Sequence, residues 1–287
     1  MGDPREILVL HTGGTIGMAP GPEGLTPVSG VVEAALQRMA PGGLHIRFQA
    51  FDPLIDSAEM GPVHWNRLID AIADFRGKGV IVTHGTDTMA FTGAALSQAL
   101  AGIDLPVVLC GSMQPLNGGG DAEGNLALAL ESAQRDAPGV WLAFAGQVLA
   151  AAGLVKHDSQ GADAFRAIPQ PPEPGPFRPR RFSARRLAIL TLSPGLPAPA
   201  VAAMLGALDG AVLRVFGAGT IMSDPALEAV LAAATARGCR LRAVSQCEVG
   251  GLMPGAYAAG AALWRAGVEN GGPETPEAAL IRLWVEP

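Results

Sequence analysis

The chain has 287 residues, of which 49% are hydrophobic and 16% are charged, and it carries a formal net charge of −6. A chain of this length buries roughly 75% of the surface that it exposes when unfolded, so it needs no disulfide or structural metal to hold its fold together. Disordered chains have the opposite balance of charged and apolar residues, which excludes that class. The negative net charge argues against nucleic acid as a partner.

The three cysteines are Cys110, Cys239 and Cys247, and they form no CxxC pair. Their odd number and spacing argue against a disulfide framework and favour a reducing compartment. The N-terminal residues do not have the pattern of a signal peptide, and no uninterrupted apolar run approaches the length of a membrane span. We therefore expect a soluble, cytoplasmic protein without a membrane partner.

The first half of the chain alternates short apolar runs with longer segments of helical periodicity. These patterns predict buried strands at residues 7–11, 45–51, 79–83, 106–110 and 140–145, and amphipathic helices at residues 63–76, 87–100 and 120–135. Alternation of strand and helix implies parallel pairing with right-handed crossovers. The prediction is an α/β fold, with a doubly wound and mostly parallel sheet in an N-terminal domain of residues 1–167.

Residues 168–186 interrupt this alternation. They are rich in proline and contain a basic cluster of Arg178, Arg180, Arg181, Arg185 and Arg186. No nucleic-acid motif accompanies these arginines, so we interpret the segment as a solvated linker. Beyond it, strands are predicted at residues 187–192, 211–216 and 240–245, and helices at residues 199–208, 224–236 and 256–266. This pattern predicts a second, smaller α/β domain over residues 187–287.

The loop after the first predicted strand, residues 12–17, reads TGGTIG. Its adjacent glycines allow the backbone to approach a ligand closely and expose amide hydrogens. The segment matches neither GxGxxG nor GxxxxGK[ST], so it does not indicate a dinucleotide or P-loop site. Taken alone, it is equally compatible with a tight turn.

The loop after the third predicted strand, residues 84–89, reads HGTDTM. In an open α/β sheet, ligands lie beyond the carboxyl ends of the strands, so this loop and residues 12–17 should open on the same edge. A helix cap explains one polar residue of the run but not all of them.

Lys156 follows the fifth predicted strand, and Lys78 is the only other lysine among twenty basic residues. A lone lysine commonly lies on the surface. Lysine can nevertheless lose its proton near neutral pH when desolvated and then act as a base, which arginine cannot do. Because GxSxG, HExxH and histidines at ligand spacing are missing, the sequence implies no metal and no cofactor.

Together, TGGTIG and HGTDTM resemble the two signature segments of the bacterial-type L-asparaginases, at the separation found in that family. Further similarity runs along the chain, and the PVSG segment at residues 27–30 is similar to the cytosolic type I branch. The other similar segments are residues 54–60, 110–113, 163–165, 214–219, 257–260 and 266–268. The resemblance implies hydrolysis of L-asparagine to L-aspartate and ammonia by a homodimer or homotetramer.

The resemblance also implies a role for each site residue. Thr15 would attack the amide carbon and form an acyl-enzyme that water then hydrolyses. Lys156 would draw the proton of Thr86, and Asp87 would complete this cluster and contact the substrate ammonium. The main chain of Ser112 would lie beside the reacting amide. The other substrate-binding residues would be Gly14, Ser57, Ala58 and Gly85, of which the last three lie near the α-carboxylate.

The sequence departs from the family at two positions. Relatives carry a tyrosine in the loop after TGGTI that helps to activate the threonine, and Leu25 stands in its place. Tyr257 is the only tyrosine in the chain. Thr220 stands where many relatives have asparagine, so a hydrogen bond near the substrate is expected to differ.

Three alternative functions follow from these patterns. A glutaminase or a broader amidase is one, because the methylene that separates the two amides is worth only about 1–3 kcal/mol of discrimination. An impaired homologue that binds aspartate or asparagine as a sensor is another, motivated by Leu25. A subunit of a tRNA-dependent amidotransferase is less favoured, because the sequence has no RNA-binding extension and no broad basic surface.

Overall fold

The structure is a computed structural model that describes residues 5–22, 24–171, 173 and 175–285. The outer ends of the two predicted domains, residue 23 of the first and two residues of the predicted linker lie outside this part. The chain forms two compact units, one of Met1–Ala167 with Pro171–Phe182 and the other of Ile168–Gln170 with Ser183–Pro287. Both units therefore contain part of the proline-rich segment. The bounds 1–167, 168–186 and 187–287 stay a prediction.

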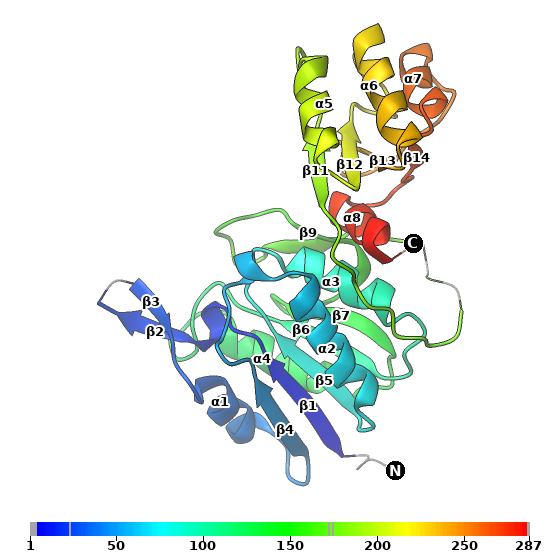
Figure 1. The fold of residues 1–287 in the computed structure, drawn as a ribbon. Coiled ribbons are helices and arrows are strands. Elements are labelled where there is room, and N and C mark those ends of the chain that lie inside the picture. Colours follow the sequence, from blue (N-terminus) through cyan, green and yellow to red (C-terminus); the bar gives the residue numbers. More distant parts are fainter. Residues whose placement is uncertain (1–4, 23, 172, 174, 286–287) are drawn as a thin grey trace. The chain divides into compact units, whose positions relative to one another are not determined.

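The first unit is built on a six-stranded sheet of order β4-β1-β5-β6-β7-β8 (Figure 1). Its first five strands pair in parallel, and β8 pairs antiparallel with β7. In sheet order the strands are β4 (His45–Ala50), β1 (Glu6–His11), β5 (Gly79–Thr83), β6 (Pro106–Cys110), β7 (Gly139–Phe144) and β8 (Gln147–Ala150).

Helices cover both faces of this sheet. On one face, alternate strand residues such as Ile7, Val9 and Ile81 form one core with residues of α1 (Val31–Met39) and α4 (Ala122–Ser132). The opposite face is covered by α2 (Pro62–Asp74) and α3 (Met89–Ala99), which lie side by side in Figure 1. The prediction of a doubly wound, mostly parallel α/β sheet is confirmed.

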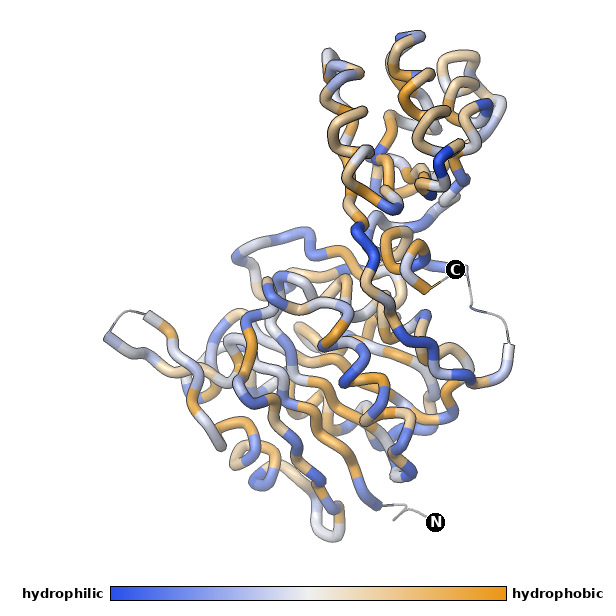
Figure 2. The backbone as a smooth tube through the Cα atoms, in the orientation of Figure 1, coloured by the Kyte–Doolittle hydropathy of each residue, from blue (hydrophilic) through white to orange (hydrophobic). Residues whose placement is uncertain are grey.

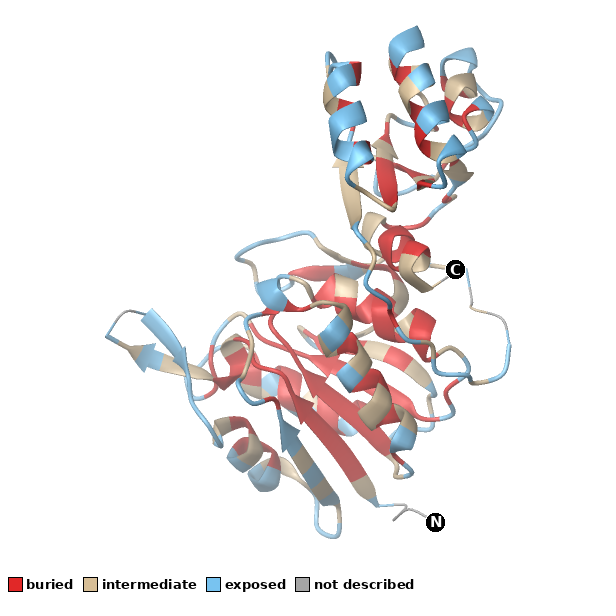
Figure 3. Cartoon of the chain, viewed as in Figure 1, coloured by how far each residue is buried: buried red, intermediate tan, exposed pale blue. Residues whose placement is uncertain are grey.

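The central strands are hydrophobic and buried, whereas β4 is not (Figures 2 and 3). All residues of β5 and β6 are buried, but every residue of β4 is exposed or half-buried. The prediction of a buried strand at residues 45–51 is therefore wrong about burial. The reason is that β4 is an edge strand with a neighbour on one side only, and half-buried edge strands tolerate polar residues such as Arg47.

Several short elements were not predicted from periodicity. They are β8, β14 (Glu269–Asn270), the hairpin of β2 (Met18–Gly21) and β3 (Gly24–Pro27), the antiparallel pair of β9 (Leu154–Lys156) and β10 (Phe165–Ala167), and the 3-10 turns Thr15–Gly17, Ser57–Glu59, Ala151–Gly153 and Ala258–Gly260. Runs of two to four residues are too short to show a repeat in hydrophobicity. Two longer helices, α1 and α8 (Pro276–Val285), were not predicted either.

The second unit has a parallel sheet of order β11-β12-β13-β14. Its core lies mainly between the sheet and three of its helices. The strands are β11 (Leu187–Thr191), β12 (Gly210–Val215), β13 (Arg240–Ser245) and β14 (Glu269–Asn270), and the helices are α5 (Ala198–Gly206), α6 (Pro225–Ala236), α7 (Ala261–Arg265) and α8 (Pro276–Val285). This agrees with the predicted smaller α/β domain.

Most arginines of the basic cluster have partners within their own unit. Arg181 pairs with Asp70 at 2.7 Å, and Arg186 pairs with Asp209 at 2.6 Å. Arg180 contacts Glu173 at 3.2 Å. These arginines therefore help to hold the proline-rich segment on the two units. Among the described residues, no helix is both long and apolar enough to cross a membrane.

Candidate active site

The strand order of the first sheet reverses beside β1, because β4 lies on one side of it and β5 on the other. In doubly wound sheets, ligands bind at this switch point, in the crevice beyond the carboxyl ends of the two strands. The loops that leave β1 and β5 at that edge are residues 12–17 and 84–88. The two segments singled out in the sequence therefore flank the position where this fold binds ligands.

These two loops approach each other backbone to backbone. Gly14 has a φ of +91°, and a Cβ placed on it would lie 2.5 Å from the backbone nitrogen of Gly85. A Cβ placed on Gly85 would lie 2.6 Å from Oγ of Ser57. A side chain at either glycine would thus force the loops apart, which is why glycine is needed at both positions.

The loop that carries Ser57 is tied to both neighbours. The Ile55 amide donates to the carbonyl of Thr12 at 2.8 Å, and the Thr88 hydroxyl donates to the carbonyl of Ser57 at 2.6 Å. The Ala58 amide already donates to Oδ1 of Asp56 at 2.9 Å. The Ser57 hydroxyl, on a buried residue beside Gly85, is a further hydrogen-bond donor at this point.

Lys156 lies beside the loop after β5. Its Nζ donates to Oγ1 of Thr86 at 2.9 Å and to Oδ1 of Asp87 at 2.7 Å. The lysine side chain is 17% exposed and that of Asp87 is 71% exposed, so the cluster has a buried end at Thr86 and an open end at the carboxylate. A hydroxyl, an amine and a carboxylate in contact can pass protons and can also hold a substrate ammonium.

The short sheet of β9 and β10 holds Lys156 in this position. Lys156 pairs with Phe165, and the Phe165 ring packs edge-on against Phe144 at the end of β7, with 5.0 Å between the ring centroids. The buried aromatic pair therefore anchors the strand from which the lysine side chain extends.

The loop that carries Ser112 depends on two residues that sequence reasoning missed. The carboxylate of Asp121 accepts the backbone amides of Met113 and Gln114, each at 2.9 Å. Asn125 donates to the carbonyl of Gly111 at 3.0 Å and accepts the amide of Ala145 at 2.8 Å. The only signal was their spacing of four residues, which places both on one face of the predicted helix.

Thr15 opens the short 3-10 turn after β1 and is half-buried. Leu25 lies on β3 opposite Pro20 and is 46% exposed, so it packs little within the chain. Tyr257 and Thr220 belong to the second unit. Tyr257 is exposed, and the Thr220 hydroxyl lies 3.5 Å from the carbonyl of Phe216.

Two buried histidines lie next to these loops. His11 precedes the first loop, and its Nδ1 lies 2.7 Å from Oγ1 of Thr83. His84 opens the second loop and is fully buried. Burial lowers the pKa of each imidazole to about 4, so both rings are neutral at pH 7.

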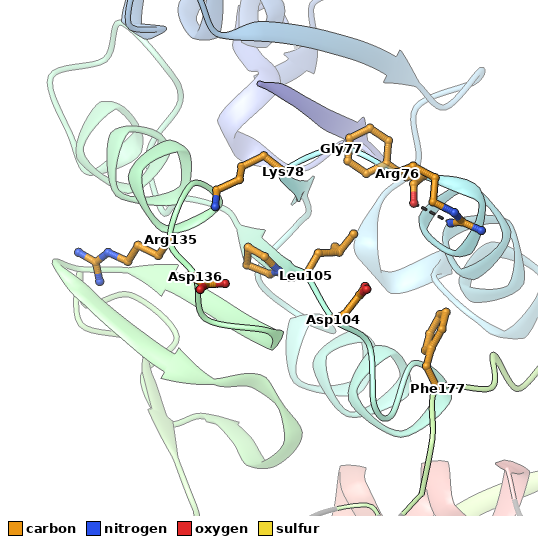
Figure 4. A pocket seen from close by; sticks show the side chains of 10 residues that line it. Arg76, Gly77, Lys78, Asp104, Leu105, Arg135, Asp136 and Phe177 are labelled. Atoms are coloured by element: carbon orange, nitrogen blue, oxygen red, sulfur yellow. Dashed lines mark hydrogen bonds between the residues drawn. The ribbon is translucent and has the colours of Figure 1, made fainter. Parts of the chain in front are cut away.

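A hollow of about 440 Å³ lies at the opposite edge of the sheet (Figure 4). It is formed where β5, β6 and β7 begin, and its lining includes Lys78, Asp104 and Asp136. The two acidic residues are exposed. Amino ends of parallel strands are not where this fold binds ligands, so we do not assign the site to this hollow. Within the described ranges, no three His, Cys, Asp or Glu side chains are grouped to hold a metal ion.

Comparison with known proteins identifies two matching domain families. Residues 6–174 match the asparaginase N-terminal family, and residues 186–285 match the glutaminase/asparaginase C-terminal domain family. L-asparaginase 1 of Escherichia coli K12 is 31% identical over 97% of this chain and 90% of its own length.

Two solved structures are similar over nearly the whole chain. The thermostable L-asparaginase of Thermococcus kodakarensis has a TM-score of 0.85 and 30% identity, and the match covers 97% of this chain and 92% of that one. L-asparaginase I of Vibrio cholerae has a TM-score of 0.86 and 27% identity over 98% of this chain and 92% of its own.

Replacing Gly14 tests the backbone contact. We expect Gly14→Ala to lower the free energy of unfolding by about 1–3 kcal/mol more than Gly139→Ala, because its Cβ overlaps the backbone of Gly85. Gly139 is the matched control, since its φ is +116° but the nearest atom to its Cβ would be 3.7 Å away. Urea denaturation of both variants measures the difference. Equal losses would mean that the two loops are not in contact.

The buried histidines make the fold sensitive to acid. An unfolded histidine has a pKa near 6.5, whereas burial lowers the pKa of His11 and His84 to about 4. As the pH falls, the unfolded state therefore takes up protons before the folded state does. The contribution of the two neutral histidines to the free energy of unfolding is complete above pH 6.5 and is lost as the pH falls towards 4. We expect the free energy of unfolding to fall by up to about 1.4 kcal/mol per pH unit for each histidine in this window. Urea denaturation between pH 4 and 8 measures the slope. His11→Asn should reduce it, and a flat profile would contradict the assignment.

Proposed function

Because the chain belongs to the asparaginase/glutaminase family of amidohydrolases, we propose that it hydrolyses L-asparagine to L-aspartate and ammonia through an acyl-enzyme at Thr15. The observation that carries this proposal is the contact of Lys156 with Thr86 and Asp87 beside the switch point, on the loop whose backbone touches that of Gly14. The relatives that match along nearly the whole chain are named L-asparaginases.

In the first half-reaction, Oγ1 of Thr15 attacks the carbon of the side-chain amide. The C–N bond breaks, and the hydroxyl proton is transferred to the leaving nitrogen, so that ammonia and a Thr15 ester are formed. A threonine hydroxyl is a weak nucleophile and requires a proton acceptor nearby. The cluster of Thr86, Lys156 and Asp87 lies on and beside the loop after β5, at the edge of the crevice, and is suited to this task.

In the second half-reaction, water attacks the ester carbon. The C–O bond to Thr15 breaks, the threonine regains its proton, and aspartate leaves. Both half-reactions develop negative charge on the carbonyl oxygen, which requires preorganised hydrogen-bond donors. The backbone amides at Gly14, Gly85 and Ser112 are suited to this role, because glycines next to the crevice let a substrate approach the main chain closely.

The substrate is a zwitterion and needs opposite charges at its two ends. The exposed carboxylate of Asp87 suits the ammonium group, and the hydroxyl of Ser57 suits the α-carboxylate. We therefore propose Asp87 and Ser57 as substrate-binding residues. Ala58 has a smaller part, because its amide donates to Asp56. We further propose a cytoplasmic homodimer or homotetramer, as the type I resemblance implies.

Substituting each of the two lysines distinguishes a catalytic effect of Lys156 from a general effect of losing one positive charge. We expect Thr15→Ala to reduce ammonia release from L-asparagine at least about a thousandfold, and Lys156→Met to reduce it about a hundredfold. Lys78→Met removes the only other lysine, which lines the hollow at the opposite edge, and should leave the rate within about twofold. The assay measures ammonia from L-asparagine, L-glutamine and D-asparagine.

The same assay, combined with a titration that measures aspartate binding, decides among the alternative functions. Faster release from L-glutamine would assign a glutaminase. Tight binding of aspartate with no release from any amide would assign a sensor. A rate that Thr15→Ala leaves unchanged would refute the acyl-enzyme.

Leu25 is the second point to test. Leucine cannot transfer a proton, and Leu25 is exposed on the hairpin of β2 and β3. We expect Leu25→Tyr to raise kcat about tenfold by adding a phenol that assists Thr15, with Leu25→Phe as the control that adds the ring without its hydroxyl. Equal kcat values for the two variants would show that proton transfer from Thr15 does not need the hairpin.

A further inference from the structure

A buried chain of hydrogen bonds joins helix α2 to the loop after β5, through side chains that the proposed reaction does not use. Nε1 of Trp65 donates to Oγ1 of Thr92 at 3.0 Å. Oγ1 of Thr92 lies 2.8 Å from Nε2 of His84, and Nδ1 of His84 lies 2.6 Å from the carbonyl oxygen of Gly85. Trp65 is 3% exposed, and the other two side chains are fully buried.

Only one arrangement of hydrogens satisfies every member of this chain. An indole nitrogen can only donate, so Thr92 accepts from Trp65 and gives its own hydrogen to Nε2 of His84. A carbonyl oxygen can only accept, so Nδ1 of His84 carries the hydrogen of the ring. The imidazole is therefore neutral, in agreement with the lowered pKa that burial gives it.

The last hydrogen bond of this series, from Nδ1 of His84 to the carbonyl of Gly85, controls the orientation of a peptide plane at the candidate site. The carbonyl of Gly85 and the amide of Thr86 belong to one trans peptide and point in opposite directions. The ring that holds the carbonyl therefore also sets the direction of the Thr86 amide. Glycine adopts many backbone conformations, so without this bond the peptide could rotate. Within the part of the chain that the structure describes, the Thr86 amide has no protein acceptor.

We propose that Trp65, Thr92 and His84 are positioning residues that fix the peptide between Gly85 and Thr86, and with it the Thr86 hydroxyl beside Lys156, for reaction with the substrate amide. This inference rests on the proposed function. The three residues act through Gly85 and do not touch the substrate themselves.

Trp65, at the outer end of this series of hydrogen bonds, is held firmly. The Phe182 ring packs against Trp65 with 5.2 Å between the ring centroids. The backbone of Phe182 exchanges two hydrogen bonds of 2.8 Å with the side chain of Asn66. The end of the proline-rich segment thus covers the indole and limits its movement.

A second histidine–threonine pair provides a matched control. His11 and Thr83 are also buried and are joined by a contact of 2.7 Å, and burial lowers the pKa of His11 in the same way. Within the described residues, the His11 ring has no hydrogen bond to a carbonyl of the candidate site. Loss of this pair should cost stability without moving the peptide between Gly85 and Thr86.

The test compares Thr92→Val, which keeps the shape of the side chain and removes both hydrogen bonds, with Thr92→Ser and Thr83→Val. We expect Thr92→Val to lower kcat for L-asparagine about tenfold, with KM changed less than about threefold, because a displaced Thr86 hydroxyl slows proton transfer in the transition state more than it weakens substrate binding. Thr92→Ser should restore kcat to within about threefold. Thr83→Val should lower the melting temperature as much as Thr92→Val but keep kcat.

Equal kcat values for Thr92→Val and Thr83→Val at equal loss of melting temperature would overturn the inference and leave the proposed function intact. A wild-type protein that releases no ammonia from any amide would instead overturn the proposed function. If Thr92→Val does not fold, Trp65→Phe removes only the indole donor and takes its place. In the wild type, nitrogen NMR at pH 7 should show the His84 hydrogen on Nδ1, and a hydrogen on Nε2 would refute the assignment.

Discussion

Gly14 and Gly85 bring the loops after β1 and β5 together backbone to backbone, with no space for a side chain on either residue. This contact fixes the loop that carries Thr15 against the loop that carries Thr86, at the switch point of the sheet. The other supports of the site act on these loops. Asp121 holds the neighbouring loop of Ser112, and the pair of β9 and β10 supplies the lysine.

The parts of the site that could be predicted lie in short, continuous segments. TGGTIG and HGTDTM each follow an apolar strand, and parallel strands bring their carboxyl ends to one edge. The same argument predicted the doubly wound sheet, because strand and helix alternate plainly along residues 7–145. It overestimated the burial of β4, since the amino-acid pattern of an apolar run does not reveal which strand will lie at the edge of the sheet.

The supporting residues could not be predicted in the same way. Trp65, Thr92 and Asn125 lie on helices whose periodicity shows only that they face inward, and their hydrogen bonds reach loops distant in the chain. A buried polar side chain requires a partner, but its sequence neighbours do not identify that partner. The role proposed for Lys156 rests on the scarcity of lysine in the chain and on the family resemblance, whereas its contacts are seen in the fold.

The large sequence separations within the candidate site affect the order in which its parts can form during synthesis. Lys156 contacts Thr86 across 70 residues, and Thr12 contacts Thr83 across 71. Contacts of this range form slowly, because the entropy of closing a long loop is lost before the contact stabilises the chain. Chains emerge from the ribosome amino end first, so Thr15 and Thr86 are translated well before the strands that support Lys156. A nascent chain that ends before residue 165 would therefore contain both signature loops and still lack the strand pair that holds the lysine in place.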